Sequence, residues 1–531
     1  MKKVDTDKAS ATAGKIIKKF SDLAKKNSAY PTRSEMIKGG TSRDIIRHYF
    51  GDMDGLKLAA KVAYPEKFEN VIDLEMFNDQ AFNDIKAKVA SHKVFVIQSV
   101  IAGAPVHKKL KASVETYLKK RKGMHLIIAA DYALQSIDPD LMSDPTVEIV
   151  FRTLNLNSNI CVNPIKIDPK QMDPATSLDS FGHSETVIIG SPKQRRVPVA
   201  NSNGKLARVI QATGALTKPN YVPRDGVPKR RDTLADKQHR MGGVIVEIVN
   251  DKLYHFRHFE MCKDGSFNDL FYNYSGSGVK FVGCEAIIQG DKHVGDTDPV
   301  VNKAVDEMCL VGKPKYRVEH DFFNGASISH HSRDLRIERA IAAAKGKVSL
   351  DKELKITADE LFRVRKLKTA SVHVIVESNH NDWLMQYLNK GDFTDENRHI
   401  STKLTDKAIG GEHPLQAAMG LFGVKTGADL KYLQIDDDFV VAGVALGNHG
   451  HLGSNGKRNP GTKGMYKAYG KCFFGHGHHG EIFHDAIMVG TSTHLKLGYN
   501  KGASSWDNSQ GILYSDGTRQ LVNVILGKWR S

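Results

Sequence analysis

A glycine- and histidine-rich segment near the carboxyl end of the chain carries the strongest chemical signal. Residues 473–480 read Phe-Phe-Gly-His-Gly-His-His-Gly, so one glycine separates His476 from His478 after an apolar run typical of a β-strand. Two imidazoles at the end of a strand can point into one cavity and bind a transition metal. Taken alone, the segment fits a solvated surface turn equally well.

Four earlier apolar runs end in side chains of the same chemical kind. The candidate ligands are Asp291 and His293 after residues 279–288, Asp321 after residues 316–319, Asn379 after residues 370–376, and His449 after residues 440–446. Parallel strands bring their carboxyl ends to one edge of a sheet, where open α/β folds bind ligands. A carboxylate at that edge can bridge two cations about 3.5–4 Å apart. We therefore expect a site for two metal ions, with His380 available for proton transfer.

The order of these motifs resembles that of the calcineurin-like metallophosphoesterase superfamily. Asp-x-His, Asp-x-x-Asn, Asn-His, a single His and Gly-His-x-His follow one another over about residues 279–525. The resemblance implies two ligand groups that share one bridging carboxylate. They are Asp291, His293, Asp321 and His478 for one ion, and Asp321, Asn379, His449 and His476 for the other. It also implies that His380 protonates the leaving oxygen or stabilises the transition state. Mn²⁺ is the implied ion, and mixed nitrogen and oxygen ligands would also accept iron or zinc.

Some positions depart from the family pattern without removing a ligand. His320 and Ser378 stand where glycine is usual, and Asn381 stands where an acidic residue is usual, with Asp382 one place later. Asp321 is followed by Phe-Phe-Asn-Gly and lacks the Arg-Gly pair of serine/threonine protein phosphatases. The DNA-degrading nucleases of the superfamily are the better match, and they imply a metal-dependent phosphodiesterase.

One ligand assignment has an alternative. Residues 447–450, Gly-Asn-His-Gly, match the asparagine-histidine motif more literally than the segment around Asn379 does. His449 nevertheless lies only 27 residues before His476, where the family places its isolated histidine. His451 competes with His449 for that role.

Over its whole length the chain also resembles the pre-early proteins of T5-like phages. The segments that carry this resemblance are residues 321–331, 449–456 and 497–506. It implies a phage-encoded protein used in host DNA degradation and in phage DNA transfer, at work in the cytoplasm of the host bacterium. We also expect a homo-oligomer and, as a further partner, another phage pre-early protein.

A small group of residues could contact the substrate. The candidates are His330, His331, His451, Tyr499, Lys501 and Trp506. In residues 497–506 an aromatic ring for stacking, a cation and hydroxyl donors follow a glycine, a combination that suits a nucleotide or a phosphate. A plain glycine-rich turn is an equal alternative for this segment. His330 and His331 either line the site or cap a following helix.

The composition favours a polyanionic partner. Lys and Arg (76) exceed Asp and Glu (60) by 16, and the pI is about 9.3, so we expect DNA as the partner, with RNA not excluded. The excess of lysine could instead serve solubility alone. The chain has no apolar run of membrane-spanning length, its start lacks a signal core, and its five cysteines are scattered, so a cytoplasmic protein without disulfides is expected.

The positions of these segments predict three regions in an α/β protein. Residues 1–88 form a helical module that resembles a helix-turn-helix, with a plain helical bundle as the alternative; helices are expected at residues 11–26, after residue 32 and after residue 42. Residues 89–240 form an α/β middle domain that ends in a basic linker from residue 218. Residues 241–531 form the metallophosphoesterase domain, a β-sandwich flanked by helices.

Two other classes of function remain open at this stage. A phosphomonoesterase acting on a small substrate would share the metal ligands but would not need the excess positive charge. A non-catalytic DNA-binding or DNA-transfer protein would keep the basic surface and bind metal weakly.

Overall fold

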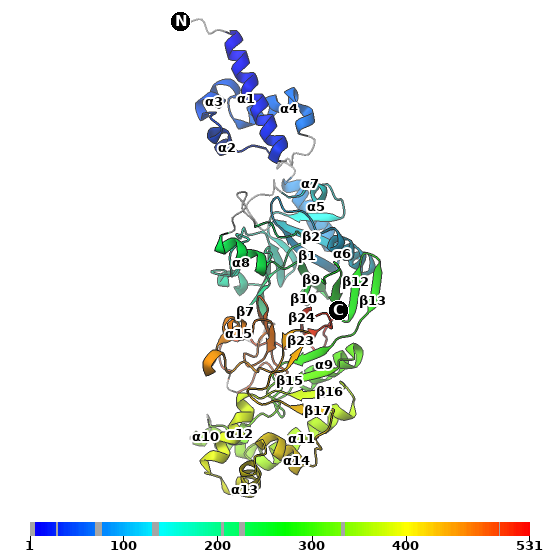
Figure 1. Ribbon diagram of the computed structural model, residues 1–531, viewed down its shortest axis with the longest axis vertical. Helices are drawn as coiled ribbons and strands as arrows, with labels where there is room; N and C mark the ends of the chain where they lie inside the picture. Colours follow the sequence, from blue (N-terminus) through cyan, green and yellow to red (C-terminus); the bar gives the residue numbers. More distant parts are fainter. Residues whose placement is uncertain are drawn as a thin grey trace.

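The computed structural model describes residues 6–27, 30–68, 77–129, 137–202, 207–221, 229–330, 335–498 and 500–531. In these residues the chain is a mixed α/β protein with four β-sheets (Figure 1). None of the helices described is both long and apolar enough to cross a lipid bilayer.

The amino-terminal region is a small lobe of helices at one end of the molecule (Figure 1). Its helices are α1 (Thr6–Asn27), α2 (Arg33–Lys38), α3 (Arg43–Phe50) and α4 (Met53–Ala63). The Thr32 hydroxyl accepts from the Glu35 amide and the Glu35 carboxylate accepts from the Thr32 amide, while Ser42 caps α3, as helix starts require. The three predicted helices are confirmed. The fourth helix adds Leu56 to a core that also contains Phe20 and Met36.

A five-stranded sheet follows, with the strand order β10-β9-β1-β2-β3. Its strands are β1 (Val94–Val100), β2 (Met124–Ala129), β3 (Val147–Val150), β9 (Gly242–Ile248) and β10 (Tyr254–Glu260). The first three are parallel, and the β9–β10 hairpin joins β1 in antiparallel orientation. The helices around it are α5 (Asp79–Ser91), α6 (Lys108–Arg121), α7 (Pro139–Met142) and α8 (Arg230–Gln238).

A six-stranded sheet has the order β17-β16-β15-β14-β23-β24. Its strands are β14 (Ala286–Gln289), β15 (Tyr316–Glu319), β16 (Val372–Ile375), β17 (Leu430–Tyr432), β23 (Ser509–Leu513) and β24 (Arg519–Asn523). Strands β14 to β17 are parallel, and β23 joins β14 in antiparallel orientation. The helices of this region are α9 (Pro299–Gly312), α10 (Arg336–Ala344), α11 (Leu350–Lys366), α12 (Asn379–Lys390), α13 (Asp395–Ile409), α14 (Pro414–Leu421) and α15 (Gly461–Tyr469).

A ten-stranded sheet, in the order β18-β19-β20-β22-β21-β7-β8-β6-β5-β4, runs through both halves of the chain. Its strands are β4 (Leu154–Asn157), β5 (Ile160–Asn163), β6 (Thr186–Ile189), β7 (Arg195–Val199), β8 (Arg208–Ala212), β18 (Val440–Val441), β19 (Val444–Ala445), β20 (Cys472–Phe474), β21 (Glu481–Phe483) and β22 (Ala486–Met488). It packs against the six-stranded sheet through buried residues such as Ile288, Val318, Phe473 and Ile487. A three-stranded sheet contains β11 (Phe267–Asp269), β12 (Tyr272–Ser275) and β13 (Gly278–Phe281).

Three local expectations need correction. The single strand predicted at residues 440–446 is two short antiparallel strands, because Ala442 and Gly443 adopt positive φ and form a tight turn. Part of the segment predicted as a linker is helix α8, whose Ala235 is buried. The sheets also do not separate at residue 240, since β9 and β10 pair in the sheet of β1.

Candidate metal centre

The loops after β14 and β15 run side by side and carry three of the predicted ligands. The Lys292 amide donates to the His320 carbonyl (3.0 Å), and the His293 amide donates to the Asp321 carbonyl (2.7 Å). These bonds extend the strand pairing beyond the sheet, so Asp291, His293 and Asp321 leave the same edge. The pairing of β14 with β15 therefore brings together residues that are about thirty positions apart in the sequence.

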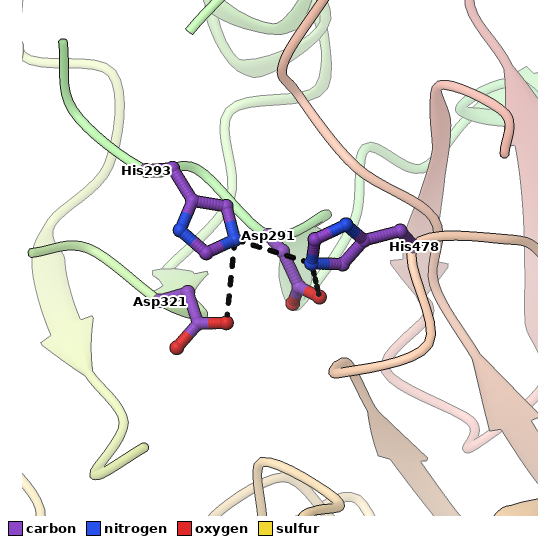
Figure 2. Close-up of side chains that lie close together, drawn as sticks. All are labelled: Asp291, His293, Asp321 and His478. Atoms are coloured by element: carbon purple, nitrogen blue, oxygen red, sulfur yellow. Dashed lines mark hydrogen bonds and ion pairs between the residues drawn. The ribbon is translucent and has the colours of Figure 1, made fainter. Parts of the chain in front are cut away.

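Figure 2 shows that Asp291, His293, Asp321 and His478 point toward one another. Each offers one ligand atom, and these atoms all lie within 4.8 Å of one another in a buried cluster. His293 Nε2 lies 3.1 Å from His478 Nε2 and 3.5 Å from Asp321 Oδ2, and His478 Nε2 lies 3.2 Å from Asp291 Oδ2. The structure thus brings together the whole first predicted ligand group.

The unpaired polar atoms of this cluster fit a metal ion. The carboxylate oxygens Asp291 Oδ1 and Asp321 Oδ1 are buried and make no hydrogen bond, an arrangement that is costly unless a neighbouring group such as a cation compensates the charge. Burial lowers the pKa of His478 to about 3 and lowers that of His293 well below its ordinary value. Burial also raises the pKa of Asp291. Neutral imidazoles and carboxylates that gain from a cation are the donor set that a divalent ion requires.

The second predicted group gathers on the other side of Asp321. His449 Nε2 lies 3.2 Å from Asp321 Oδ2, and His476 Nδ1 lies 3.2 Å from the amide oxygen of Asn379. The rings of His449 and His476 have centroids 5.2 Å apart. Asp321 therefore lies between the two groups, in the place of a bridging ligand.

A glycine allows the histidine loop to approach the carboxylates. A Cβ atom on Gly475 would lie 2.2 Å from Asp291 Oδ1, so no side chain fits there. The His476 amide donates to Asp291 Oδ2 (2.8 Å), which ties the loop to the first ligand. His293, Asp321, His476 and His478 all have positive φ, between 42° and 78°. Such strained backbone is concentrated at functional sites, where the surroundings hold it in place.

His380 lies over the cluster at the start of α12. Its ring packs against His293 and Trp383, with centroid distances of 4.5 and 3.9 Å. Nδ1 is 2.5 Å from the carbonyl oxygen of Asn324 and must donate to it, since a carbonyl oxygen can only accept. This leaves Nε2 as the ring nitrogen that can exchange a proton.

Only some of the residues predicted to contact the substrate lie next to the candidate ligands. The Trp506 ring lies 4.2 Å from that of His478, and the His451 ring lies 5.5 Å from that of His449. His330 contacts Trp383 and lines a cavity with Arg339 and Lys390. Lys501 is exposed. His331 and Tyr499 lie outside the described residues.

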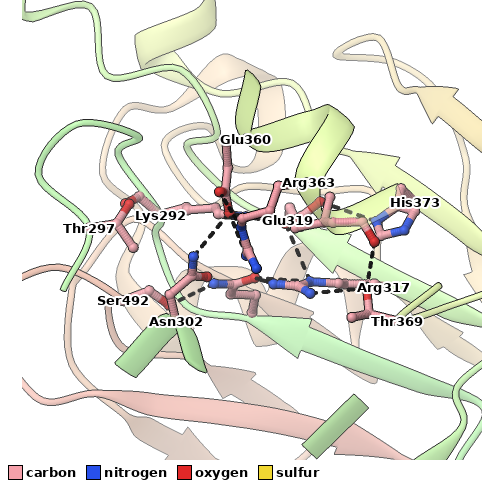
Figure 3. Close-up of polar contacts among 12 residues, drawn as sticks. Lys292, Thr297, Asn302, Arg317, Glu319, Glu360, Arg363, Thr369, His373 and Ser492 are labelled. Atoms are coloured by element: carbon pink, nitrogen blue, oxygen red, sulfur yellow. Dashed lines mark hydrogen bonds and ion pairs between the residues drawn. The ribbon is translucent and has the colours of Figure 1, made fainter. Parts of the chain in front are cut away.

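Sequence reasoning missed a buried polar network next to the cluster of candidate ligands (Figure 3). Lys292 Nζ bonds to Glu319 Oε1 (2.7 Å) and Glu360 Oε1 (2.9 Å), and Arg317 bonds to Asp306 and Gln289 (both 2.7 Å). Lys292, Glu319 and Arg317 have no exposed surface. Strand alternation is the signal that could have found them, because Lys292 lies between two ligands and must face the opposite side.

Trp383 and Asn459 were also missed, whereas Asn324 was noted only as part of the Asp-x-x-Asn motif. Asn459 Oδ1 lies 2.8 Å from His476 Nε2, so His476 donates through Nε2 and keeps the lone pair of Nδ1 for a metal. Asn324 follows the bridging aspartate by three residues, and Trp383 follows His380 by three, on the same face of α12. The spacings of Asn324 and Trp383 can be read from the sequence, whereas the position of Asn459 next to His476 cannot.

Comparison with known proteins finds a relative from a bacteriophage. The chain is 28% identical over 483 residues to Protein A1 of Escherichia phage T5, which covers 83% of this chain and 84% of the relative. No protein-family model and no solved structure matches the chain. The similarity supports a relation to phage proteins.

Proposed function

We propose that this protein is a metal-dependent deoxyribonuclease that hydrolyses phosphodiester bonds with two divalent ions, most simply Mn²⁺. The observation that carries the proposal is that eight predicted side chains from five strand ends lie next to one another, four of them in a buried cluster. They are Asp291, His293, Asp321, Asn379, His380, His449, His476 and His478. The ligand types and their order resemble those of the metallophosphoesterase superfamily, which is why we propose that mechanism for this chain.

When bound, the two ions would supply positive charge that neutralises the phosphoryl oxygens as the transition state forms. The residues of the chain would do the rest. Asp321 would hold both ions at a fixed separation, while the first and second ligand groups fix each ion in place. His380 would deliver a proton to the leaving oxygen through Nε2, because Nδ1 is committed to the Asn324 carbonyl. Trp383 packs on the His380 ring and holds its orientation.

We propose DNA as the substrate because the protein has a large positive net charge and is similar in sequence to a phage protein. The formal net charge is +16, and a groove of the amino-terminal lobe is lined by five lysines together with Asp22 and Glu35. The lysines are Lys15, Lys18, Lys19, Lys26 and Lys38. Positive surface of this kind binds phosphate backbones independently of sequence. A phage origin fits host DNA degradation and phage DNA transfer in the cytoplasm of the infected cell, with another pre-early protein as partner and a homo-oligomer as the working form.

The decisive test measures hydrolysis of plasmid DNA by the purified protein with Mn²⁺. Asp321→Ala should abolish hydrolysis and reduce Mn²⁺ binding, because it removes the shared ligand. His380→Ala should slow hydrolysis by about 10²–10⁴-fold while Mn²⁺ still binds, the range for loss of a general acid. Undiminished hydrolysis by both variants would refute the mechanism.

Two alternatives are separated by the same preparation. A phosphomonoesterase would hydrolyse a nitrophenyl phosphate faster than DNA, and comparing the two rates of hydrolysis tests this alternative. A non-catalytic DNA-binding protein would bind DNA but retain no metal after dialysis, which elemental analysis measures directly.

A further inference from the structure

The sheet that precedes the metal-binding region repeats the architecture of the sheet that carries the ligands. The order β10-β9-β1-β2-β3 corresponds to β24-β23-β14-β15-β16, strand by strand. In both sheets the first three strands along the chain are parallel, and a later antiparallel hairpin joins the first of them. Matching order, direction and chain sequence in five strands is unlikely to arise from local preferences, because each pairing is long-range.

Hydrogen bonds beyond the first strand match residue by residue. The Ser99 amide donates to Gly214 (3.0 Å) and its carbonyl accepts from Leu216 (2.8 Å). The Asp291 amide donates to Gly490 (3.0 Å) and its carbonyl accepts from Ser492 (2.8 Å). Ser99 therefore occupies the position of the metal ligand Asp291.

The helices after these strands correspond as well. Helices α6 and α9 each have 14 residues and end at a lysine in the left-handed conformation, Lys122 (φ 49°) and Lys313 (φ 50°). The residue before each helix makes a matching hydrogen bond. The His107 amide donates to the Leu216 carbonyl, and the Asp298 amide donates to the Ser492 carbonyl (both 2.9 Å). Leu216 and Ser492 already correspond through their bonds to Ser99 and Asp291.

The ten-stranded sheet has the same strands on either side of its centre. Read outward from the β7–β21 contact, it contains β7, β8, β6, β5, β4 on one side and β21, β22, β20, β19, β18 on the other, with the same parallel and antiparallel pairings. The central strands pair antiparallel, Arg196 with Ile482 and Arg195 with Phe483. The two units, residues 94–260 and residues 286–524, are thus related by an approximate two-fold axis at this contact.

At the described positions that match, the first unit lacks the ligands of the second. Register places Ser99, Ile101 and Ile128 where Asp291, His293 and Asp321 stand. Residues 190–193, Gly-Ser-Pro-Lys, stand in place of the histidine loop after the matching strand. Ile101 packs in a buried apolar cluster with Ala104, Tyr221 and Ala235. This cluster fills the space next to the Ser99 strand end with carbon atoms, which cannot ligate a metal.

The ligand-free unit reaches the metal site through one buried arginine. Arg196 of β7 is 1% exposed; its Nη2 bonds to Asp507 Oδ2 (2.6 Å) and its Nη1 to Asn523 Oδ1 (2.8 Å). Asp507 Oδ1 accepts from the Gly480 amide (3.0 Å), and the Asp507 amide donates to the His478 carbonyl (3.1 Å). Arg196 therefore fixes the aspartate that holds both ends of the loop from His478 to Gly480.

We propose that residues 94–260 are a second copy of the metal-binding unit that has lost its ligands and acts as a built-in partner subunit, with Arg196 positioning His478 through Asp507. Each chain then holds one pair of ions, and the contact at β7–β21 replaces the interface that two separate subunits would need. The positioning role rests on the proposed metal-dependent function, whereas the repeat rests on strand pairing alone.

The test titrates Mn²⁺ into metal-free, full-length protein by calorimetry. The wild type should bind two ions per chain. Arg196→Met should lower Mn²⁺ affinity by about 10–100-fold, the usual effect of losing a group that orients a metal ligand, and Arg196→Lys should restore part of it. The control is Arg257→Met. Arg257 is equally buried and is paired with Glu247 (2.9 Å) of the ligand-free unit and with Asp269 (2.5 Å). Neither partner belongs to the His478 loop, so the Arg257→Met protein should bind Mn²⁺ with the affinity of the wild type.

Each result separates the claims. Four ions per chain would overturn the loss of ligands in the first unit. Wild-type affinity in a folded Arg196→Met protein, or an equal loss in Arg257→Met, would overturn the positioning role. If Arg196→Met does not fold, Asp507→Asn keeps the side-chain shape and must show the same loss of affinity. A wild type that neither binds Mn²⁺ nor cuts DNA would instead refute the proposed function, and the positioning role with it.

Discussion

The two matching units show how one fold can carry a cluster of candidate metal ligands or do without one. In residues 286–524 the strand ends present Asp291, His293 and Asp321, each with a buried polar atom that lacks a hydrogen bond. In residues 94–260 the Ser99 hydroxyl is satisfied by the Gly214 carbonyl (2.6 Å), and Ile128 is apolar. The fold positions the side chains in both units, but only their identity decides whether a cation is needed.

Backbone strain differs between the units in the same way. His293, Asp321, His476 and His478 have positive φ, whereas Ile101, Ile128 and residues 191–193, which stand at or near the matching positions, do not. Holding a non-glycine residue at positive φ costs free energy, of order 1–3 kcal/mol. The strain is therefore not a requirement of the fold. It accompanies the ligands, and it orients their side chains toward one point.

The largest expected effect comes from adding one methyl group at matched glycines. Gly475 and Gly190 follow the corresponding strands β20 and β6. A Cβ on Gly475 would lie 2.2 Å from Asp291 Oδ1, and a Cβ on Gly190 would lie 2.6 Å from Ile128 Cγ2. We expect Gly475→Ala to lower Mn²⁺ affinity by more than about 100-fold, beyond the usual effect of groups that only orient a ligand, and to abolish DNA hydrolysis.

Gly190→Ala is the control for this prediction. It crowds an apolar core and should lower the free energy of unfolding by about 1–3 kcal/mol, with Mn²⁺ affinity unchanged. Calorimetric titration and chemical denaturation of both variants check the pair. Equal losses of Mn²⁺ affinity in the two variants would mean that the units do not differ in the way described.

The sequence predicted which side chains of the second unit lie together at one edge, for a physical reason. Each ligand follows an apolar run, and a buried parallel strand is the element that such a run forms most readily. Asp291, His293, Asp321 and His478 could thus be placed at one edge before any pairing was known. Asn379 and His449 followed from the same rule, although the run before His449 proved to be a hairpin of two-residue strands.

The relation between the units could not be predicted in this way. The pairings that reveal it, such as β1 with β9 and β7 with β21, join residues about 150 and 290 positions apart, and no local pattern encodes them. The first unit has also lost the polar residues that would mark a motif, so Ser99 and Ile128 looked like ordinary strand residues. The predicted boundary at residue 240 fell between two strands of one sheet for the same reason.

A smaller effect is expected from the polar network behind the ligands. Lys292 and Glu319 are buried and bonded to each other, whereas the matching residues of the first unit are Val100 and Leu126. The double variant Lys292→Val, Glu319→Leu gives the second unit the residues of the first. We expect Mn²⁺ affinity to fall by about 10–100-fold, because the ligand loops lose their support.

The free energy of unfolding should fall more in Lys292→Val alone than in the double variant, unlike the Mn²⁺ affinity. Lys292→Val alone leaves the Glu319 carboxylate without its lysine and should cost about 3–5 kcal/mol of unfolding free energy, whereas the double variant should cost less. Glu360 keeps Arg363, and Arg317 keeps Asp306, so the rest of the network stays paired. Denaturation curves measure the difference. A double variant that binds Mn²⁺ as tightly as the wild type would show that the network serves folding alone.

The smallest effect is expected from acid, and it lies in the ligand-free unit. His125 of β2 occupies the position of Val318 in the second unit, is 1% exposed and lies 2.9 Å from Gln98 Oε1. Burial lowers its pKa from 6.5 to about 3. Between these values the unfolded chain binds a proton that the folded chain does not, so unfolding is favoured as pH falls. At one pKa unit per 1.36 kcal/mol, His125 should account for roughly 2 kcal/mol of the stability lost between pH 6.5 and pH 5.

His125→Gln tests this without disturbing the metal site. Glutamine can donate to Gln98 Oε1 as the imidazole does, but it does not titrate, so the metal-free variant should lose less unfolding free energy than the wild type on acidification. Denaturant unfolding at pH 7 and pH 5 measures both losses. Other buried histidines, including His258 and His478, have pKa values lowered by burial to about 3, so the remaining acid sensitivity should persist in the variant. Identical losses in the two proteins would show that His125 does not contribute to the acid sensitivity.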